Sequence, residues 1–235
     1  MSDDSVALVA KPSDPHTGVG RYAQTLRLAL ERAGASVVEV APAVPPLPGA
    51  GYSAFRRFGV DPRAFLTTYP IWARYPAATL YHLTSQNLAS LLLFHPPPGK
   101  VVVTVHDIIP YLRRDQPRFR SDRTIADWTF DRLAMAGLRR ADLLIAVSHD
   151  TRRCLVEHLE IPAARVEVVW QGVDHARFHP ESRLAGARER YRLPIGSRFL
   201  IYVGSDDPRK DLPTLLRALA LVRAERPDVE LVKVG

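Results

Sequence analysis

The sequence predicts an α/β fold with a doubly wound parallel sheet, because short β-branched runs alternate with helical patterns along the chain. Several of these runs are apolar throughout, which is typical of strands buried on both faces of a parallel sheet. The strands predicted for a first domain are Val6–Ala10, Ser36–Val40, Thr79–Leu83, Val101–Val105, Asp142–Val147 and Val166–Trp170. The helices expected between them are Gly20–Ala33, Ser121–Arg140 and His149–Leu159, and the proline-rich stretch 41–51 indicates a loop.

A second α/β unit is expected near the end of the chain. It comprises a strand at Phe199–Val203, a helix at Leu212–Glu225 and a strand at Val229–Val234. The buried stripe expected on that helix consists of Leu212, Leu215, Leu216, Leu219 and Val222. One βαβ unit cannot cover both faces of its own sheet. We therefore expect a complete domain over residues 1–172 and a linker with an incomplete, truncated second domain over residues 173–235.

The composition is that of a globular protein with a basic surface. The chain has 235 residues, 46% of them hydrophobic, and a formal net charge of +7 that comes almost entirely from arginine. Arginine grips phosphates and carboxylates bidentately, so the excess indicates anionic partners, unless it reflects a GC-rich genome. No nucleic-acid motif is present. A single cysteine, an acidic start and no apolar stretch of membrane-spanning length favour a cytoplasmic protein.

A glycine-containing segment precedes the first predicted helix, with Gly18 and Gly20 followed by Arg21 and Tyr22. Such a segment either binds an anion through backbone N–H groups or forms a plain tight turn. It also satisfies the dinucleotide fingerprint G-x-G-x-x-A, which would indicate an NAD-dependent oxidoreductase. We discount that interpretation, because residues 11–17 separate the first glycine from the strand.

His106 and Asp107 follow the apolar strand Val101–Val105, where open parallel sheets bind their ligands. His106 could hydrogen-bond a sugar hydroxyl or a diphosphate oxygen, or it could simply cap loop carbonyls. Asp107 could fix the tautomer of His106 or cap the next turn. Ser148 is the expected N-cap of the helix His149–Leu159, a role that still allows it to line a cleft.

Gly204 ends the strand Phe199–Val203, and Arg209 and Lys210 stand just before the next helix. Two cations at a helix N-terminus make a diphosphate clamp, and the alternative is a solvated charged turn. The sequence has no D-x-D triplet for a divalent metal, no zinc-ligand spacing, no G-x-S-x-G nucleophile motif and no Walker loop.

Taken in order, these segments resemble family 4 glycosyltransferases over essentially the whole chain. The resemblance includes Gly18-Val19-Gly20-Arg21-Tyr22, His106-Asp107, Ala146-Val147-Ser148, Gly172-Val173-Asp174 and Arg209-Lys210-Asp211-Leu212. It implies a GT-B fold, in which an acceptor-binding and a donor-binding Rossmann-like domain face a cleft. It further implies metal-independent transfer of a hexose, mannosyl- or rhamnosyl-like, from a nucleotide sugar to a glycan or glycolipid with retention, in surface-polysaccharide or glycoconjugate biosynthesis.

The resemblance also assigns roles to individual residues. His106 would be the catalytic cleft histidine. The donor would be bound by Gly18, Gly20, Ser148, Gly204, Arg209 and Lys210. The acceptor would be bound by Arg21, Tyr22, Asp107, Arg113 and Arg114, and no metal or other cofactor is expected. Gln171 stands where the family usually has asparagine, and the glutamate pair of the family's second domain falls beyond residue 235, so a non-catalytic acceptor-binding remnant is the main alternative.

A cluster of arginines lies just after the His106 strand. It consists of Arg113, Arg114, Arg118, Arg120 and Arg123, with Tyr111 and Phe119 among them. Cations mixed with aromatic residues are typical of contact with anionic lipid headgroups. The cluster predicts an anionic or lipid-linked acceptor and peripheral membrane attachment, and the alternative is a solvated loop.

Overall fold

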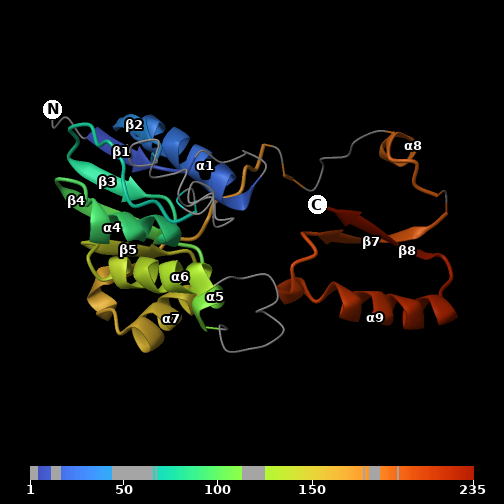
Figure 1. Ribbon diagram of the computed structural model, residues 1–235. Helices are drawn as coiled ribbons and strands as arrows, with labels where there is room; N and C mark the ends of the chain where they lie inside the picture. Colours follow the sequence, from blue (N-terminus) through green and yellow to red (C-terminus); the bar gives the residue numbers. More distant parts are fainter. Residues whose placement is uncertain are drawn as a thin grey trace, which may run out of the picture. The chain divides into compact units, whose positions relative to one another are not determined.

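The computed structural model describes residues 5–11, 17–43, 66, 68–112, 125–176, 178–179, 186–194 and 196–235. These residues form two compact units, which divide between Gln171 and Gly172 (Figure 1). The first unit carries a six-stranded sheet and the second a two-stranded one.

The sheet of the first unit is fully parallel, which confirms the predicted fold class. Its strands are β1 (Ser5–Val9), β2 (Ser36–Val40), β3 (Leu80–Leu83), β4 (Lys100–Val105), β5 (Leu143–Ala146) and β6 (Val166–Val168). They pair in the order β2-β1-β3-β4-β5-β6. Each lies within two residues of its predicted position. The largest difference is at β6, which ends at Val168, two residues before its predicted end at Trp170. The Trp170 side chain is 71% exposed.

The helices of the first unit connect these strands. They are α1 (Gly18–Arg32), α4 (Leu91–Phe94), α5 (Ile109–Leu112), α6 (Ile125–Leu138) and α7 (His149–Leu159), with 3-10 turns η1 (Gln86–Ser90) and η3 (Ala163–Arg165). Helix α7 has the predicted bounds. Helix α1 starts two residues earlier than predicted, because the Thr17 hydroxyl accepts from the Gly20 N–H and caps it. The short elements η1, α4 and α5 were not predicted from the sequence, because they are too short to show a helical period.

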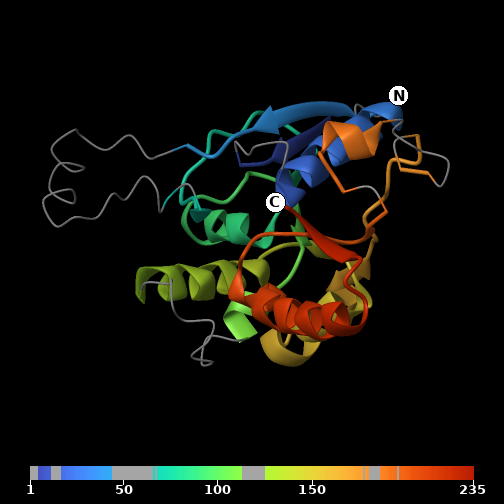
Figure 2. The same ribbon diagram turned by 90° about the vertical axis from the view of Figure 1, so that its right-hand side faces the viewer.

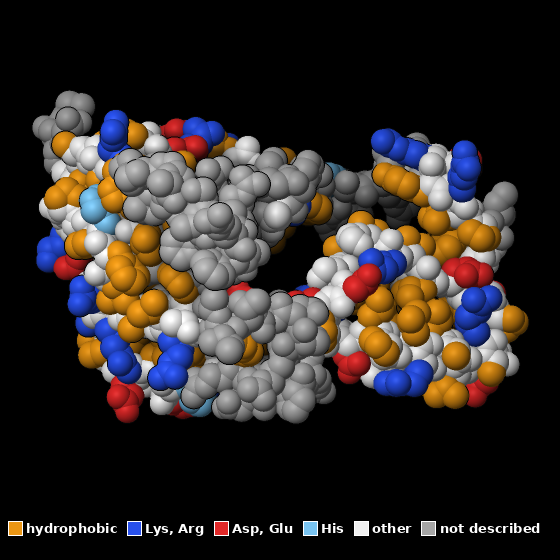
Figure 3. Space-filling view, in the orientation of Figure 1, with side chains coloured by type: hydrophobic (Ala, Val, Ile, Leu, Met, Phe, Trp, Pro, Cys, Tyr) orange, Lys and Arg blue, Asp and Glu red, His pale blue; other side chains and the backbone are white. Residues whose placement is uncertain are grey.

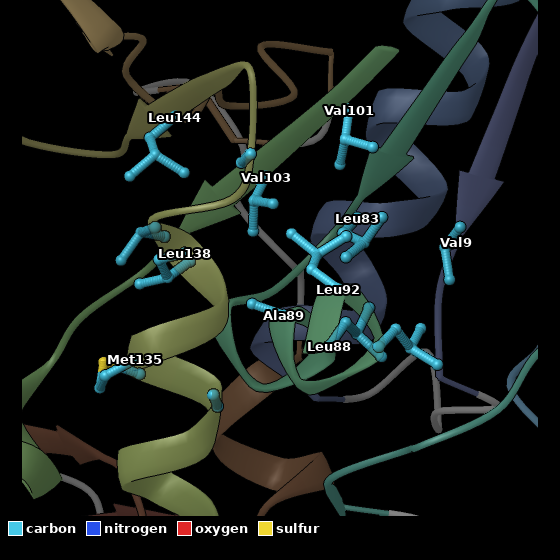
Figure 4. Close-up of a cluster of buried hydrophobic side chains, with 14 of the residues drawn as sticks. Val9, Leu83, Leu88, Ala89, Leu92, Val101, Val103, Met135, Leu138 and Leu144 are labelled. Atoms are coloured by element: carbon cyan, nitrogen blue, oxygen red, sulfur yellow. The ribbon is translucent and has the colours of Figure 1, made fainter. Parts of the chain in front are cut away.

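Helix α1 covers one face of the sheet, and α4, α6 and α7 cover the other. Figures 1 and 2 both show α1 beside β1 and β2, away from α6 and α7. On the second face, side chains from the strands meet those of α6 and η1 in one buried cluster, which includes Val9, Leu83, Val103, Leu88 and Leu138 (Figure 4). Helix α6 approaches η1 so closely that a β-carbon at Gly137 would overlap the Ala89 carbonyl.

The second unit pairs β7 (Arg198–Val203) with β8 (Val229–Val234) in parallel through α9 (Leu212–Glu225). Before this unit's sheet lies the short helix α8 (Ala187–Arg190), and η4 (Pro208–Lys210) precedes α9. The expected buried stripe of α9 is wrong, because none of its residues is buried: Leu212, Leu215 and Leu219 are half-buried. Leu216 and Val222 are exposed, at 49% and 42%, because two strands are too narrow to cover the stripe.

We expect the second unit to open at a lower free energy than the first. Apolar side chains of β7 are left in solvent, with Ile201 69% and Val203 72% exposed, and Figure 3 shows apolar surface on this unit. Little buried area and an unpaired strand edge favour local opening. Hydrogen exchange measured by mass spectrometry on the whole chain should show faster exchange in β7 and β8 than in β3 and β4. Equal protection in a monomer would contradict this expectation.

Candidate site at the carboxyl edge of the sheet

His106 follows β4 directly and lies at the carboxyl edge of the sheet, as predicted for a ligand-binding position. Its backbone is held on both sides. The His106 N–H donates to Gln86 Oε1 at 3.1 Å, and the His106 carbonyl accepts from the Thr151 hydroxyl at 3.3 Å. The histidine is therefore fixed by η1 and by the first turn of α7.

Both ring nitrogens of His106 are engaged within the first unit. Nε2 lies 2.9 Å from the Thr84 carbonyl oxygen, which can only accept, so Nε2 carries the proton. Nδ1 is then the lone pair that accepts from the Gln171 side-chain amide at 2.9 Å. Burial lowers the pKa of His106, against the Thr84 hydrogen bond and the Asp107 charge, which raise it. The ring is thus held neutral, with Nδ1 as its only basic atom.

Asp107 caps the following turn and does not set the tautomer of His106. Its Oδ1 accepts from the Ile109 N–H at 3.1 Å, at the start of α5. Of the two roles that the sequence left open, the structure therefore shows the capping role. The tautomer is set by Thr84 instead.

Tyr22 lies against His106 from the α1 side. The two rings meet edge to face, with centroids 4.9 Å apart and an interplanar angle of 88°. The Tyr22 hydroxyl lies 2.8 Å from Thr104 Oγ1, which is also 2.8 Å from His82 Nε2. Burial raises the pKa of Tyr22 and lowers the pKa of His82 to about 4, so this inner chain is neutral at physiological pH. In this structure the Tyr22 hydroxyl points into the sheet, and it is the ring that borders the site.

Gly18 and Gly20 do not form a loop, because both belong to the first turn of α1. A β-carbon at Gly18 would meet no atom within 4 Å, so the space beside it is open. Arg21 is exposed. Backbone N–H groups and the positive end of the helix dipole meet at this turn, an arrangement that suits an anion.

Ser148 has the predicted capping role, since its hydroxyl accepts from the Thr151 N–H at 3.0 Å. Thr151 in turn holds the His106 carbonyl, so the cap of α7 belongs to the same hydrogen-bonded network. Arg113 and Arg114, together with Arg118, Arg120 and Arg123, lie outside the described residues.

In the second unit, Gly204 has a φ of +156°, where a side chain would be strained, and its N–H donates to the Val234 carbonyl. Lys210 closes η4, its side chain is exposed, and Asp211 occupies the N-cap position of α9. The backbone of Arg209 lies in the same turn. The residues expected to clamp a diphosphate are therefore neighbours at one helix N-terminus.

Sequence reasoning missed the residues that hold His106 in place. Thr84 follows β3, Gln86 lies in η1 and Thr151 in α7, and they act through a carbonyl, an amide and a hydroxyl, which carry no spacing pattern. Only Gln171 could be singled out from the sequence, because it is a glutamine at a position where the family usually has asparagine.

The first part of the chain matches a known family. The model of Glycosyltransferase Family 4 matches residues 16–177, more than half of the sequence. The chain belongs to glycosyltransferase family 4. This match confirms the resemblance seen in the sequence, and it includes α1, the His106 network and the sheet from β2 to β6.

Individual relatives match over shorter stretches. The chain is 40% identical over 89 residues to a D-inositol 3-phosphate glycosyltransferase of Thermobispora bispora, which covers 38% of this chain and 21% of that protein. It is 27% identical over 135 residues to the serotype-specific mannosyltransferase WbdA of Escherichia coli, which covers 54% of this chain and 15% of that protein.

Two solved structures share the fold. Sucrose-phosphate synthase (tll1590) from Thermosynechococcus elongatus superposes with a TM-score of 0.64 at 21% identity, covering 99% of this chain and 62% of that one. Anabaena Alr3699/HepE in complex with UDP and glucose gives 0.55 at 18% identity, covering 99% and 61%. The chain thus spans about three fifths of the length of these structures.

Proposed function

We propose that this chain forms the acceptor-side domain and the start of the donor-side domain of a retaining hexosyltransferase. The enzyme moves a mannosyl- or rhamnosyl-like sugar from a nucleotide-diphosphate sugar to a glycan or glycolipid, in the synthesis of surface polysaccharide or other glycoconjugates. The C1–oxygen bond to the diphosphate breaks, a glycosidic bond to the acceptor oxygen forms on the same face, and the acceptor proton passes to the leaving phosphate. No metal or other cofactor takes part.

The observation that carries the proposal is the neutral His106 at the carboxyl edge, inside the segment that matches the family. Because Nδ1 is its only basic atom, a sugar hydroxyl can bind there once Gln171 moves aside. A mannosyltransferase among the relatives supports a hexose, and the UDP and glucose held by one structural neighbour support a nucleotide-sugar donor.

The test is transfer by an enzyme that contains this chain, supplied with UDP-, GDP- and dTDP-sugars. Product NMR should show the donor's anomeric configuration retained. The coupling between H1 and C1 distinguishes the two anomers directly. Inversion would refute the retaining mechanism, and acceptor binding without donor binding or turnover would favour the acceptor-binding remnant.

We also propose that the protein works in the cytoplasm, at an anionic membrane surface. None of the helices in the described part of the chain has the length and apolarity of a membrane span. The five arginines between residues 113 and 123 support attachment through charge. The protein should float with anionic vesicles and detach as salt is raised. Equal recovery with neutral vesicles would rule out attachment by charge.

A further inference from the structure

Lys11 and Ser85 occupy neighbouring positions just beyond the ends of β1 and β3. Val9 and Leu83 are register partners in the two strands. The ladder continues past them, because the Thr84 N–H donates to the Val9 carbonyl at 3.0 Å and Ser85 is extended, with φ −153° and ψ 154°. Ser85 therefore extends from the face of the sheet that carries Leu83 (Figure 4), and Lys11, two residues after Val9, lies at the same edge of the sheet.

The gap between β1 and β3 is the point at which the sheet reverses its winding. From β1 the chain crosses over α1 to β2 on one side, whereas β3 and the strands after it extend on the other side. In open α/β sheets, ligands bind outside the carboxyl ends of the strands at this point. Lys11 and Ser85 lie at that position.

Among the residues that the structure describes, neither side chain has the partner that its chemistry requires. Ser85 is only 4% exposed, and within the described part of the chain its hydroxyl has no hydrogen-bond partner. Lys11 is partly buried, and burial lowers its pKa to about 8. No described carboxylate forms an ion pair with Lys11. A single oxyanion can accept a hydrogen bond from the partly buried ammonium of Lys11 and another from the unsatisfied hydroxyl of Ser85, so it would satisfy both groups.

We propose that Lys11 and Ser85 form a subsite for an oxyanion, a phosphate or a carboxylate, carried by the acceptor. The Lys11 ammonium supplies the charge and the Ser85 hydroxyl donates a hydrogen bond. The subsite lies at the same edge of the sheet as His106, because the carbonyl that holds the His106 ring belongs to Thr84, the residue before Ser85. β1 and β4 are two strands apart, so the ends of the strands that carry Lys11 and His106 are separated by roughly 10 Å along the sheet. The assignment to the acceptor rests on the proposed function.

Calorimetric titration of the whole chain with inorganic phosphate tests the subsite without any donor or turnover. Lys11→Met and Ser85→Ala should each weaken phosphate binding by at least ~10-fold, because each removes one hydrogen bond to a charged group. Lys11→Arg should retain binding. The matched control is Lys100→Met, since Lys100 is 77% exposed, lies at the opposite end of β4 and pairs with Asp142.

A parallel titration with acetate separates the two anion classes, and Lys11-dependent binding of either one supports the subsite. If Lys11→Met and Lys100→Met bind phosphate and acetate equally, the subsite is refuted and the proposed transfer is left untouched. Should Lys11→Met fail to fold, the Lys11 Cε resonance of the parent chain gives the answer. That resonance, assigned by its loss in Lys11→Arg, must shift when phosphate or acetate is added, and its failure to move with both overturns the proposal.

Discussion

Replacing both Arg209 and Lys210 with alanine is expected to raise the donor Kd by ~10² to ~10⁴. Each substitution removes a charge-assisted contact worth about 1.5–3 kcal/mol, and every 1.4 kcal/mol is about tenfold in affinity. Lys210 is exposed and forms no ion pair with any described carboxylate, so its charge is available. The turn that carries both residues ends at the N-terminus of α9, whose dipole also favours a diphosphate.

The matched control for this pair is Arg217→Ala with Arg223→Ala. It removes two positive charges from exposed positions further along α9, so any general effect of net charge appears equally in both proteins. Donor affinity is measured by calorimetry with UDP- and GDP-sugars at two salt concentrations, in an enzyme that contains this chain. Equal affinities in the clamp and control variants would identify the turn as a solvated one without a role in donor binding.

The sheet could be predicted because its signals are local. Strands such as β4 and β5 are mainly apolar or β-branched runs, and α7 has a serine cap at its start and an apolar period along it. Each of these patterns can be recognised within a stretch of about ten to fifteen residues. The segment Gln86–Phe94 has no such period, since its apolar residues run almost continuously from Leu88 to Phe94, and its conformation depends on the contact with α6.

The site could be predicted only at the level of its position. The alternation of strands and helices locates His106 at the carboxyl edge, but its hydrogen bonds come from residues 20, 22, 45 and 65 positions away in sequence. Such contacts depend on the register of β3 against β4 and on where α7 begins. The inward direction of the Tyr22 hydroxyl likewise depends on Thr104, a residue of β4 with no pattern of its own.

His106→Ala is expected to lower turnover by on the order of 10²-fold, the low end of what a positioned acid–base or hydrogen-bonding group supplies. The ring is neutral, its Nε2–H is fixed by Thr84, and its Nδ1 is held by an exposed side chain that substrate can displace. Nitrogen-15 NMR should find the Nε2–H tautomer, and Gln171→Ala should retain it, because the Thr84 carbonyl sets it.

The control is His158→Ala, an exposed histidine in the last turn of α7, at the opposite edge of the sheet. Helices in such a fold run antiparallel to the strands, so this position is remote from the carboxyl ends. Thermal melts should show that both variants are folded. If His106→Ala then turns over within twofold of His158→Ala, His106 has no part in the chemistry, and its hydrogen bonds to Thr84 and Gln86 serve only to join β4 to β3 and η1.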